Sequence, residues 1–229
     1  MRRLAGAAVI LTNLVNRCQV DLIFADRNHS EELDALWPTA VAMIATLGDP
    51  LIEMEVNVEE EDLIRLALDA GFEASEALNR TCWIPASDCP KIPPLRSDLT
   101  LHSRAESRCE LHPMIGRNGE ALAQRLFERS LYNPVLDLAV YSSHDEVAGY
   151  TIFWADPVTR VGLVEAMRTE GEFPGHGIAR HMLVAGHDRL VRSGCQRLKV
   201  SSGIRLHQSA GFLPTSQSVT LSRSVLVSP

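Results

Sequence analysis

One segment, from Glu165 to Ala179, combines residue types and spacings that suggest binding chemistry. A predicted strand runs into a turn that holds Gly175 and Gly177, and a predicted helix follows at once. Glycine lets the backbone approach a ligand without a clash from a Cβ atom. The N–H groups and positive dipole end at a helix start attract anions, so the segment predicts a phosphate or diphosphate site.

Two familiar phosphate-binding motifs do not fit this segment. The dinucleotide fingerprint needs a third glycine and a later strand that ends in an acidic residue, and neither follows. A P-loop needs Lys and then Ser or Thr after its second glycine, but Ile178 and Ala179 stand there. Two glycines alone are a weak signal, so a plain strand–loop–helix connection remains the alternative.

The elements around the turn place it at the centre of an expected α/β unit. Strands are predicted at 136–141 and 147–154, joined as a hairpin by the turn at 143–146, and a third strand is predicted at 161–169. The helix after the turn is predicted at 178–193 and is closed by Gly194. The other expected elements are a helix at 119–130, a strand at 197–201, a short helix at 204–210 and a β segment from Phe212.

The first part of the chain shows a related order, which indicates an internal repeat. The expected elements there are strands at 20–25, 51–56 and 81–84 and helices at 30–47 and 59–70. The pattern Ile64-Arg65-Leu66, three residues, Ala70-Gly71-Phe72 recurs as Ile204-Arg205-Leu206, three residues, Ala210-Gly211-Phe212. The sequence therefore predicts two copies of one α/β unit, the first partly eroded.

A proline-rich stretch marks the boundary between the two predicted units. Four prolines fall between positions 85 and 94, and proline removes a backbone donor and fixes φ, so neither a helix nor a central strand crosses here. We expect a partial unit at 1–90, a linker at 91–99 and a complete unit at 100–229.

The element order and two local motifs resemble the GCN5-related N-acetyltransferase (GNAT) family, the acetyl-CoA-dependent N-acyltransferases. The family loop reads Gln/Arg-x-x-Gly-x-Gly/Ala. Gly177 and Ala179 match its last two signature positions, and Pro174 replaces the Gln or Arg. The family motif Leu-Tyr-x-x-x-Gly-Phe appears as Leu206-His207-Gln208-Ser209-Ala210-Gly211-Phe212. The resemblance covers about residues 100–229.

The resemblance implies an α/β fold (an α+β mixed sheet of GNAT type) in tandem, with the N-terminal unit partial. It implies acetyl-CoA as cosubstrate and no metal. The strand at Met167, Arg168 and Thr169 would pair with the pantetheine arm of the cosubstrate. The diphosphate would be held by backbone amides around Gly175, His176, Gly177, Ile178, Ala179 and Arg180.

Two side chains are candidates for proton transfer. Glu165 would act as a base for the attacking amine, directly or through water. On a regular strand it would share a face with Met167 and Thr169. A solvated or ion-paired glutamate is the alternative. His207 stands at the family's tyrosine position and could supply a proton to the leaving sulfur, and a histidine that is merely exposed or packed is the alternative there.

Composition limits the partners. The chain has 22 Lys and Arg against 29 Asp and Glu, a net charge of −7, which disfavours nucleic acid and anionic membranes and weakly favours a cationic substrate. Five widely spaced cysteines argue for a reducing cytoplasm. The apolar stretch Leu4–Val15 is interpreted as a buried element rather than an export signal. His176, His181 and His187 lack metal-binding spacing.

These observations predict an N-acetyltransferase that moves an acetyl group from acetyl-CoA to a primary amine by direct attack on the thioester. The acceptor would be a small molecule or a peptide. The alternative is a non-catalytic module that binds CoA or acyl-CoA in a regulatory or structural role, which the short loop at 201–203 supports. The sequence leaves a homodimer open.

Overall fold

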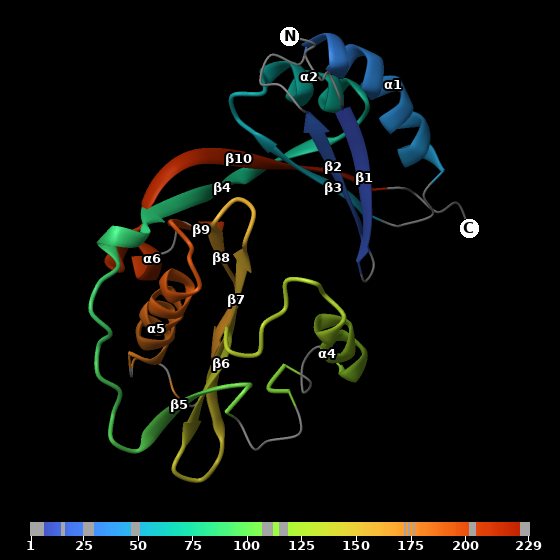
Figure 1. Cartoon of the computed structure of the whole chain (residues 1–229). Coiled ribbons are helices and arrows are strands. Elements are labelled where there is room, and N and C mark those ends of the chain that lie inside the picture. Colours follow the sequence, from blue (N-terminus) through green and yellow to red (C-terminus); the bar gives the residue numbers. More distant parts are fainter. Residues whose placement is uncertain are drawn as a thin grey trace. The chain divides into compact units, whose positions relative to one another are not determined.

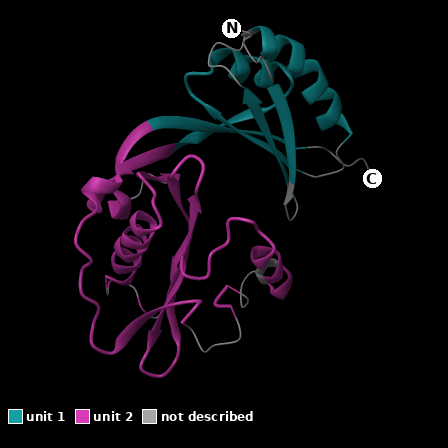
Figure 2. Cartoon of the chain, in the orientation of Figure 1, with its two compact units in different colours: residues 1–79, 216–229 teal, residues 80–215 magenta. Residues whose placement is uncertain are grey.

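The chain forms two compact units in a computed structural model (Figure 2). The structure describes residues 7–14, 17–24, 30–46, 51–106, 112–114, 119–171, 173, 175, 177–201 and 205–224. The first unit holds residues 1–79 and 216–229, and the second holds residues 80–215.

Unit 1 begins with a hairpin and continues with alternating helices and strands (Figure 1). Its elements are β1 (Ala7–Leu14), β2 (Arg17–Phe24), α1 (Ser30–Ala45), β3 (Leu51–Asn57), α2 (Glu61–Asp69) and the first part of β4 (Glu73–Pro85). The strand β1 packs Val9 and Leu11 against the core and exposes Ile10. The expected buried element near the N-terminus is therefore an amphipathic strand in its described part.

Unit 2 continues from β4 through a short 3₁₀ helix and the proline-rich stretch. Its elements are the helical turn η1 (Ala86–Asp88), β5 (Leu99–Ser103), α4 (Glu120–Phe127), β6 (Asp137–Ser142), β7 (Val147–Asp156), β8 (Val161–Thr169), α5 (Ile178–Arg192), β9 (Arg197–Ser201), α6 (Arg205–Ser209) and the start of β10 (Leu213–Ser224).

The described strands form one mixed sheet in the order β1-β2-β3-β10-β4-β9-β8-β7-β6-β5. Two strands are shared between the units: β4 leaves unit 1 and pairs antiparallel with β9, while β10 leaves unit 2 and pairs antiparallel with β3. The compact units therefore differ from the predicted division into 1–90 and 100–229, because each takes a strand from the other half of the chain.

The two halves repeat one order of elements and pairings. In the first half β1 is antiparallel to β2, β2 is parallel to β3, and β3 is antiparallel to the incoming strand β10. In the second half β7 is antiparallel to β8, β8 is parallel to β9, and β9 is antiparallel to the incoming strand β4. The same three kinds of pairing therefore occur in the same order in both halves of the chain.

One face of the unit 2 sheet is covered by α5. Gly186 in this helix meets the ring of Phe153 on β7, and a Cβ added at Gly186 would lie 2.0 Å from that ring. A Cβ added at Gly149 would likewise meet Ile178 and Met182 of α5. Residues 149, 151 and 153 alternate along β7, so these odd positions face α5.

The opposite face of unit 2 carries α4, so the two helices lie on opposite sides of β6–β8 (Figure 1). A buried network ties the α4 segment to β6: Asp137 accepts hydrogen bonds from the His112 imidazole (2.7 Å) and the Tyr132 hydroxyl (2.8 Å). Phe127 of α4 packs edge-on against both rings. Burial and the adjacent carboxylate raise the pKa of Tyr132, so its hydroxyl stays protonated and donates.

Unit 1 has its own core on one face of its strands, between the sheet and helices α1 and α2. Trp37 and Ile44 of α1 and Leu63 of α2 pack against Ile52 and Met54 of β3. None of the helices that the structure describes is long and apolar enough to cross a membrane.

Candidate functional site

The strands β8 and β9 separate partway along their length. Val161–Val164 of β8 pair in parallel with residues 197–200 of β9. Beyond Val164, β8 continues to Thr169 without pairing to the described part of β9. A strand edge without a partner offers a row of N–H and C=O groups to an extended polar chain. The segment 165–169 is therefore an open edge inside the sheet.

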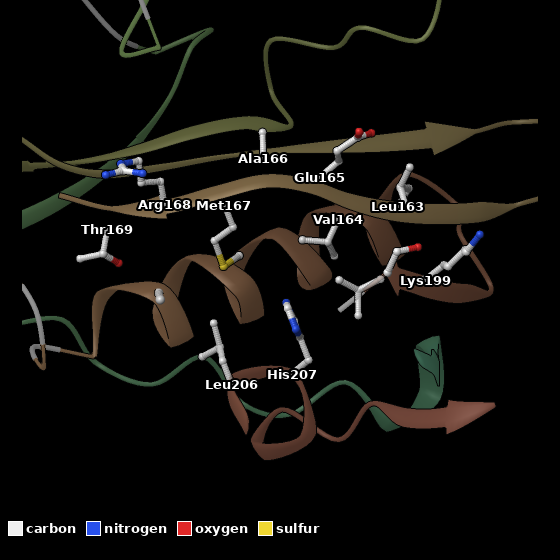
Figure 3. A pocket seen from close by; sticks show the side chains of 13 residues that line it. Leu163, Val164, Glu165, Ala166, Met167, Arg168, Thr169, Lys199, Leu206 and His207 are labelled. Atoms are coloured by element: carbon white, nitrogen blue, oxygen red, sulfur yellow. The ribbon is translucent and has the colours of Figure 1, made fainter. Parts of the chain in front are cut away.

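A β-bulge at Ala166 sets the direction of the side chains along this edge. Met167 pairs with Thr151 and Glu165 pairs with Ile152, which leaves Ala166 as the extra residue, at φ +59°. Directly paired residues share a face and sequence neighbours do not, so Glu165 and Met167 lie on opposite faces. Figure 3 shows them on opposite sides of β8.

The expectation that Glu165, Met167 and Thr169 share one face is therefore wrong. Met167 packs toward α5, and Thr169 pairs with Gly149 on that same side. Glu165 faces the other side, where its partner Ile152 is itself paired with Asp137 of the buried network.

A cleft of about 540 Å³ lies where the two strands diverge (Figure 3). Both apolar and polar side chains line it. The apolar members are Val164, Met167, Ala179, Val200 and Leu206, and the polar members include Glu165, Arg168, Thr169, Lys199, Ser201 and His207.

The start of α5 is open to an anion. Gly177 adopts the left-handed conformation at φ +72°, with no side-chain capping hydrogen bond among the described residues. A Cβ added at Gly175 or Gly177 would meet nothing within 4 Å, so no described atom crowds either glycine. The first turn carries no acidic residue, and its N–H groups and dipole are left for a negative ligand.

The corresponding helix of unit 1 does not share this property. The first turn of α1 contains Glu31 and Glu32, whose carboxylates interact favourably with the helix dipole themselves. An incoming phosphate would meet their negative charge. Of these two helices, only α5 has a first turn without acidic residues.

His207 lines the cleft from α6 and is 4% exposed. Its ring lies edge-on to Phe212 at 5.9 Å between ring centroids, and His187 of α5 lies 4.8 Å from the same phenyl ring. His187 is fully buried, and this burial, with a smaller effect of His207, lowers the pKa of His187 to about 4. His187 is therefore neutral at pH 7.

Glu165 is exposed at the opening of the cleft. It makes no hydrogen bond or ion pair with any residue that the structure describes, so the structural ion pair weighed as an alternative is not formed there. The nearby Arg168 lies 3.4 Å from the carboxylate of Glu170 instead. Glu165 thus has the accessibility that a proton acceptor needs.

The structure brings most of the predicted site residues to two adjoining places. The cleft is lined by Glu165, Met167, Arg168, Thr169, Ala179 and His207. The helix start holds the others: Gly175 and Gly177 precede α5, and Ile178 and Arg180 lie in its first turn. The side chain of Ile178 is 1% exposed, so Ile178 can offer a ligand only its backbone. His176 lies outside the described residues.

Seven of the residues that line the cleft were not predicted, among them Ala166, Lys199 and Ser201. Ala166 forms the bulge, and no sequence signal marks an alanine for a positive φ. Lys199 and Ser201 alternate with apolar residues on β9, and this period of two predicts that they share a face. No group of His, Cys, Asp and Glu with metal-binding geometry occurs among the described residues.

Searches of the sequence against protein-family models and against curated proteins gave no match. Solved structures do match. A GCN5-related N-acetyltransferase from Sphaerobacter thermophilus superposes with a TM-score of 0.68 at 12% identity, covering 95% of this chain and 76% of that one. A tandem GNAT protein from the clavulanic acid biosynthesis pathway matches with a TM-score of 0.70 at 14% identity, covering 93% and 77%.

A third match is a GCN5-related glucosamine N-acetyltransferase region in a fungal multi-domain β-N-acetylglucosaminidase. Its TM-score is 0.73 at 13% identity, with 96% of this chain and 31% of that protein covered. Identities this low establish the fold and leave the reaction open. The chain has the fold of the GCN5-related N-acetyltransferases.

Proposed function

We propose that this protein is an acetyl-CoA-dependent N-acetyltransferase that acts on a primary amine. The proposal rests on two neighbouring features of unit 2: a cleft beside an unpaired strand edge, and a helix start without a capping side chain. The unpaired edge of β8 lines a cleft, and the uncapped start of α5 follows β8 in the chain. A thioester that carries a diphosphate on an extended amide arm matches both openings.

The residues present fit such a cosubstrate. The N–H groups at the start of α5 would hold the diphosphate, since no described atom crowds Gly175 or Gly177. The backbone at 167–169 would pair with the amide arm. The apolar wall of Met167 and Leu206 would exclude water from the thioester.

The reaction would proceed by direct transfer. The neutral amine nitrogen attacks the thioester carbonyl carbon, and its excess proton passes to Glu165, directly or through water. The carbon–sulfur bond then breaks, and the thiolate gains a proton, for which the imidazole of His207 at the cleft wall is the candidate donor. The products are the N-acetyl amide and CoA with a free thiol.

The proposed setting is a reducing compartment such as the cytoplasm. Cys18, Cys82, Cys89 and Cys195 are free thiols. Burial raises the pKa of Cys82, Cys89 and Cys195, which keeps these thiols protonated and weakly reactive.

Release of CoA thiol from acetyl-CoA across a panel of primary amines tests this proposal. Calorimetric titration with CoA tests the anion site separately. Gly177→Glu should abolish CoA binding, whereas Gly194→Glu is the matched control: Gly194 also has a positive φ and open space but lies at the far end of α5. Unchanged CoA binding by Gly177→Glu would reject the diphosphate site. Binding without turnover of any amine would favour the non-catalytic module.

A further inference from the structure

Lys199 occupies an unusual position for a lysine, at the middle of the sheet. Its strand β9 lies between β8 and β4, and Lys199 is paired with Leu163 on one side and Trp83 on the other. Lysine is more typical of edge strands, where its ammonium reaches water and blocks further pairing. Here both cross-strand neighbours are hydrophobic, and the side chain is half-buried at the cleft.

The charge of Lys199 is not balanced within the part of the chain that the structure describes. Lys199 forms no ion pair or hydrogen bond there, and Glu165 forms none either. Two other cations near Lys199 are engaged: Arg168 lies beside Glu170, and Arg197 stacks on Trp83 at 4.7 Å. The cleft thus presents one carboxylate and one ammonium without partners among the described residues.

These two charges lie on the same face of neighbouring strands. Leu163 is directly opposite Lys199, and Glu165 follows Leu163 by two positions, before the bulge reverses the alternation. The strand rise places the Cα atom of Glu165 about 7 Å along β8 from that of Leu163, the cross-strand neighbour of Lys199. In Figure 3 the side chain of Leu163 lies between those of Glu165 and Lys199.

We infer that the acceptor is a small amino acid, whose amine meets Glu165 and whose carboxylate meets Lys199. This inference rests on the proposed acetyltransferase function. A carboxylate and an ammonium on the same face of neighbouring strands, both lining one cleft, are complementary to a zwitterion. The carboxylate remains bound to Lys199 throughout the reaction. The ammonium first loses one proton to solvent, the resulting neutral amine attacks the thioester, and its excess proton passes to Glu165. Lys199 therefore sets acceptor specificity.

Matched acceptors test the inference on the full chain. Mixtures of common L-amino acids, their carboxamides and the corresponding decarboxylated amines are incubated with acetyl-CoA, and the acetylated products are quantified by mass spectrometry. The free acids should exceed the carboxamides by about tenfold in kcat/KM, because only they carry the negative charge. A wild-type enzyme that acetylates amines without preferring the acids overturns the inference and leaves the proposed function standing.

Substitution assigns the preference to one side chain. Lys199→Met keeps the length and loses the charge, so the preference for acids should disappear, mainly through KM, while CoA affinity stays the same. Arg197→Met is the matched control, since Arg197 lies on the same strand and face, and it should keep the preference. Lys199→Gln serves if Lys199→Met does not fold. A preference for acids that survives both Lys199 substitutions overturns the inference.

Two further arms separate the alternatives. Succinyl-CoA and butyryl-CoA are compared with a neutral amine; a succinyl preference that Lys199→Met removes would assign Lys199 to the acyl group and overturn the inference. Amino acid binding to the CoA-saturated protein is measured by titration even if no turnover occurs. If the amino acid binds and Lys199→Met abolishes this binding, the inference is supported even when no acetyl transfer occurs. If no amino acid binds to the CoA-saturated protein, the inference is rejected.

Discussion

Glu165 and Met167 lie two positions apart on β8 and point to opposite faces of the sheet, because the bulge at Ala166 lies between them. This arrangement directs the carboxylate toward the polar opening of the cleft and the thioether toward α5. A regular strand would place both on one face. The bulge therefore separates the candidate proton acceptor from the apolar wall.

The first prediction concerns the backbone of Ala166. Its φ of +59° is unfavourable for any residue with a Cβ atom and most unfavourable for a β-branched one. Ala166→Val should lower the free energy of unfolding by about 1–2 kcal/mol, and Ala166→Gly should leave it equal or higher. Urea denaturation measures both. Equal stability of the valine and glycine variants would contradict the bulge.

The second prediction concerns the proposed base. Glu165→Gln removes the proton acceptor and preserves the shape of the side chain, so kcat should fall by about 10²-fold. Affinity for CoA should stay within about twofold, because the diphosphate site at α5 is not altered. Thiol release and calorimetric titration measure the two quantities. Glu128→Gln, at an exposed position after α4, is the control, and an equal loss in both variants would remove Glu165 from the mechanism.

The third prediction concerns pH and His187. The pKa of His187 is about 4 in the folded protein and about 6.5 in the unfolded chain. Between pH 6.5 and pH 4, His187 is therefore protonated in the unfolded state and neutral in the folded state. Stability from this group is fully present above pH 6.5 and is lost as the pH falls toward 4. Between pH 7.5 and pH 5.0 the loss should be about 2 kcal/mol.

Substitution of His187 tests that assignment. His187→Leu replaces the buried imidazole by an apolar side chain, and the pH-dependent loss should shrink by about 2 kcal/mol relative to the wild type. His144→Leu, in the exposed turn between β6 and β7, should keep the full loss. Urea denaturation at both pH values gives the comparison. An unchanged pH profile in His187→Leu would place the titrating group elsewhere.

The fourth prediction concerns the packing of α5 on β7. Gly186→Ala would place a Cβ 2.0 Å from the ring of Phe153, so the free energy of unfolding should fall by about 2–3 kcal/mol. Gly171→Ala is the control, because its added Cβ would meet nothing within 4 Å and it should change stability by less than about 0.5 kcal/mol. The double variant Gly186→Ala/Phe153→Leu should recover part of the free energy of unfolding that Gly186→Ala loses. A double variant whose loss equals the sum of the two single-variant losses would argue against this contact.

Local sequence signals predicted the order and type of most elements. Gly177 before α5 and Gly194 after it were expected to bound that helix, and the structure places it at Ile178–Arg192 with both glycines at positive φ. A strand was predicted at 161–169, and the bounds of β8 agree. Such features depend on neighbours a few positions apart, which is why the sequence alone carries them.

Tertiary structure decided what the site looks like. The bulge at Ala166 arises from the register between β7 and β8, and no residue type at that position announces it. The exchange of β4 and β10 between the units, and the pairing of Lys199 with Leu163 and Trp83, join residues far apart in the chain. Strand register depends on packing and pairing across the whole sheet, so only the folded chain shows which charges meet at the cleft.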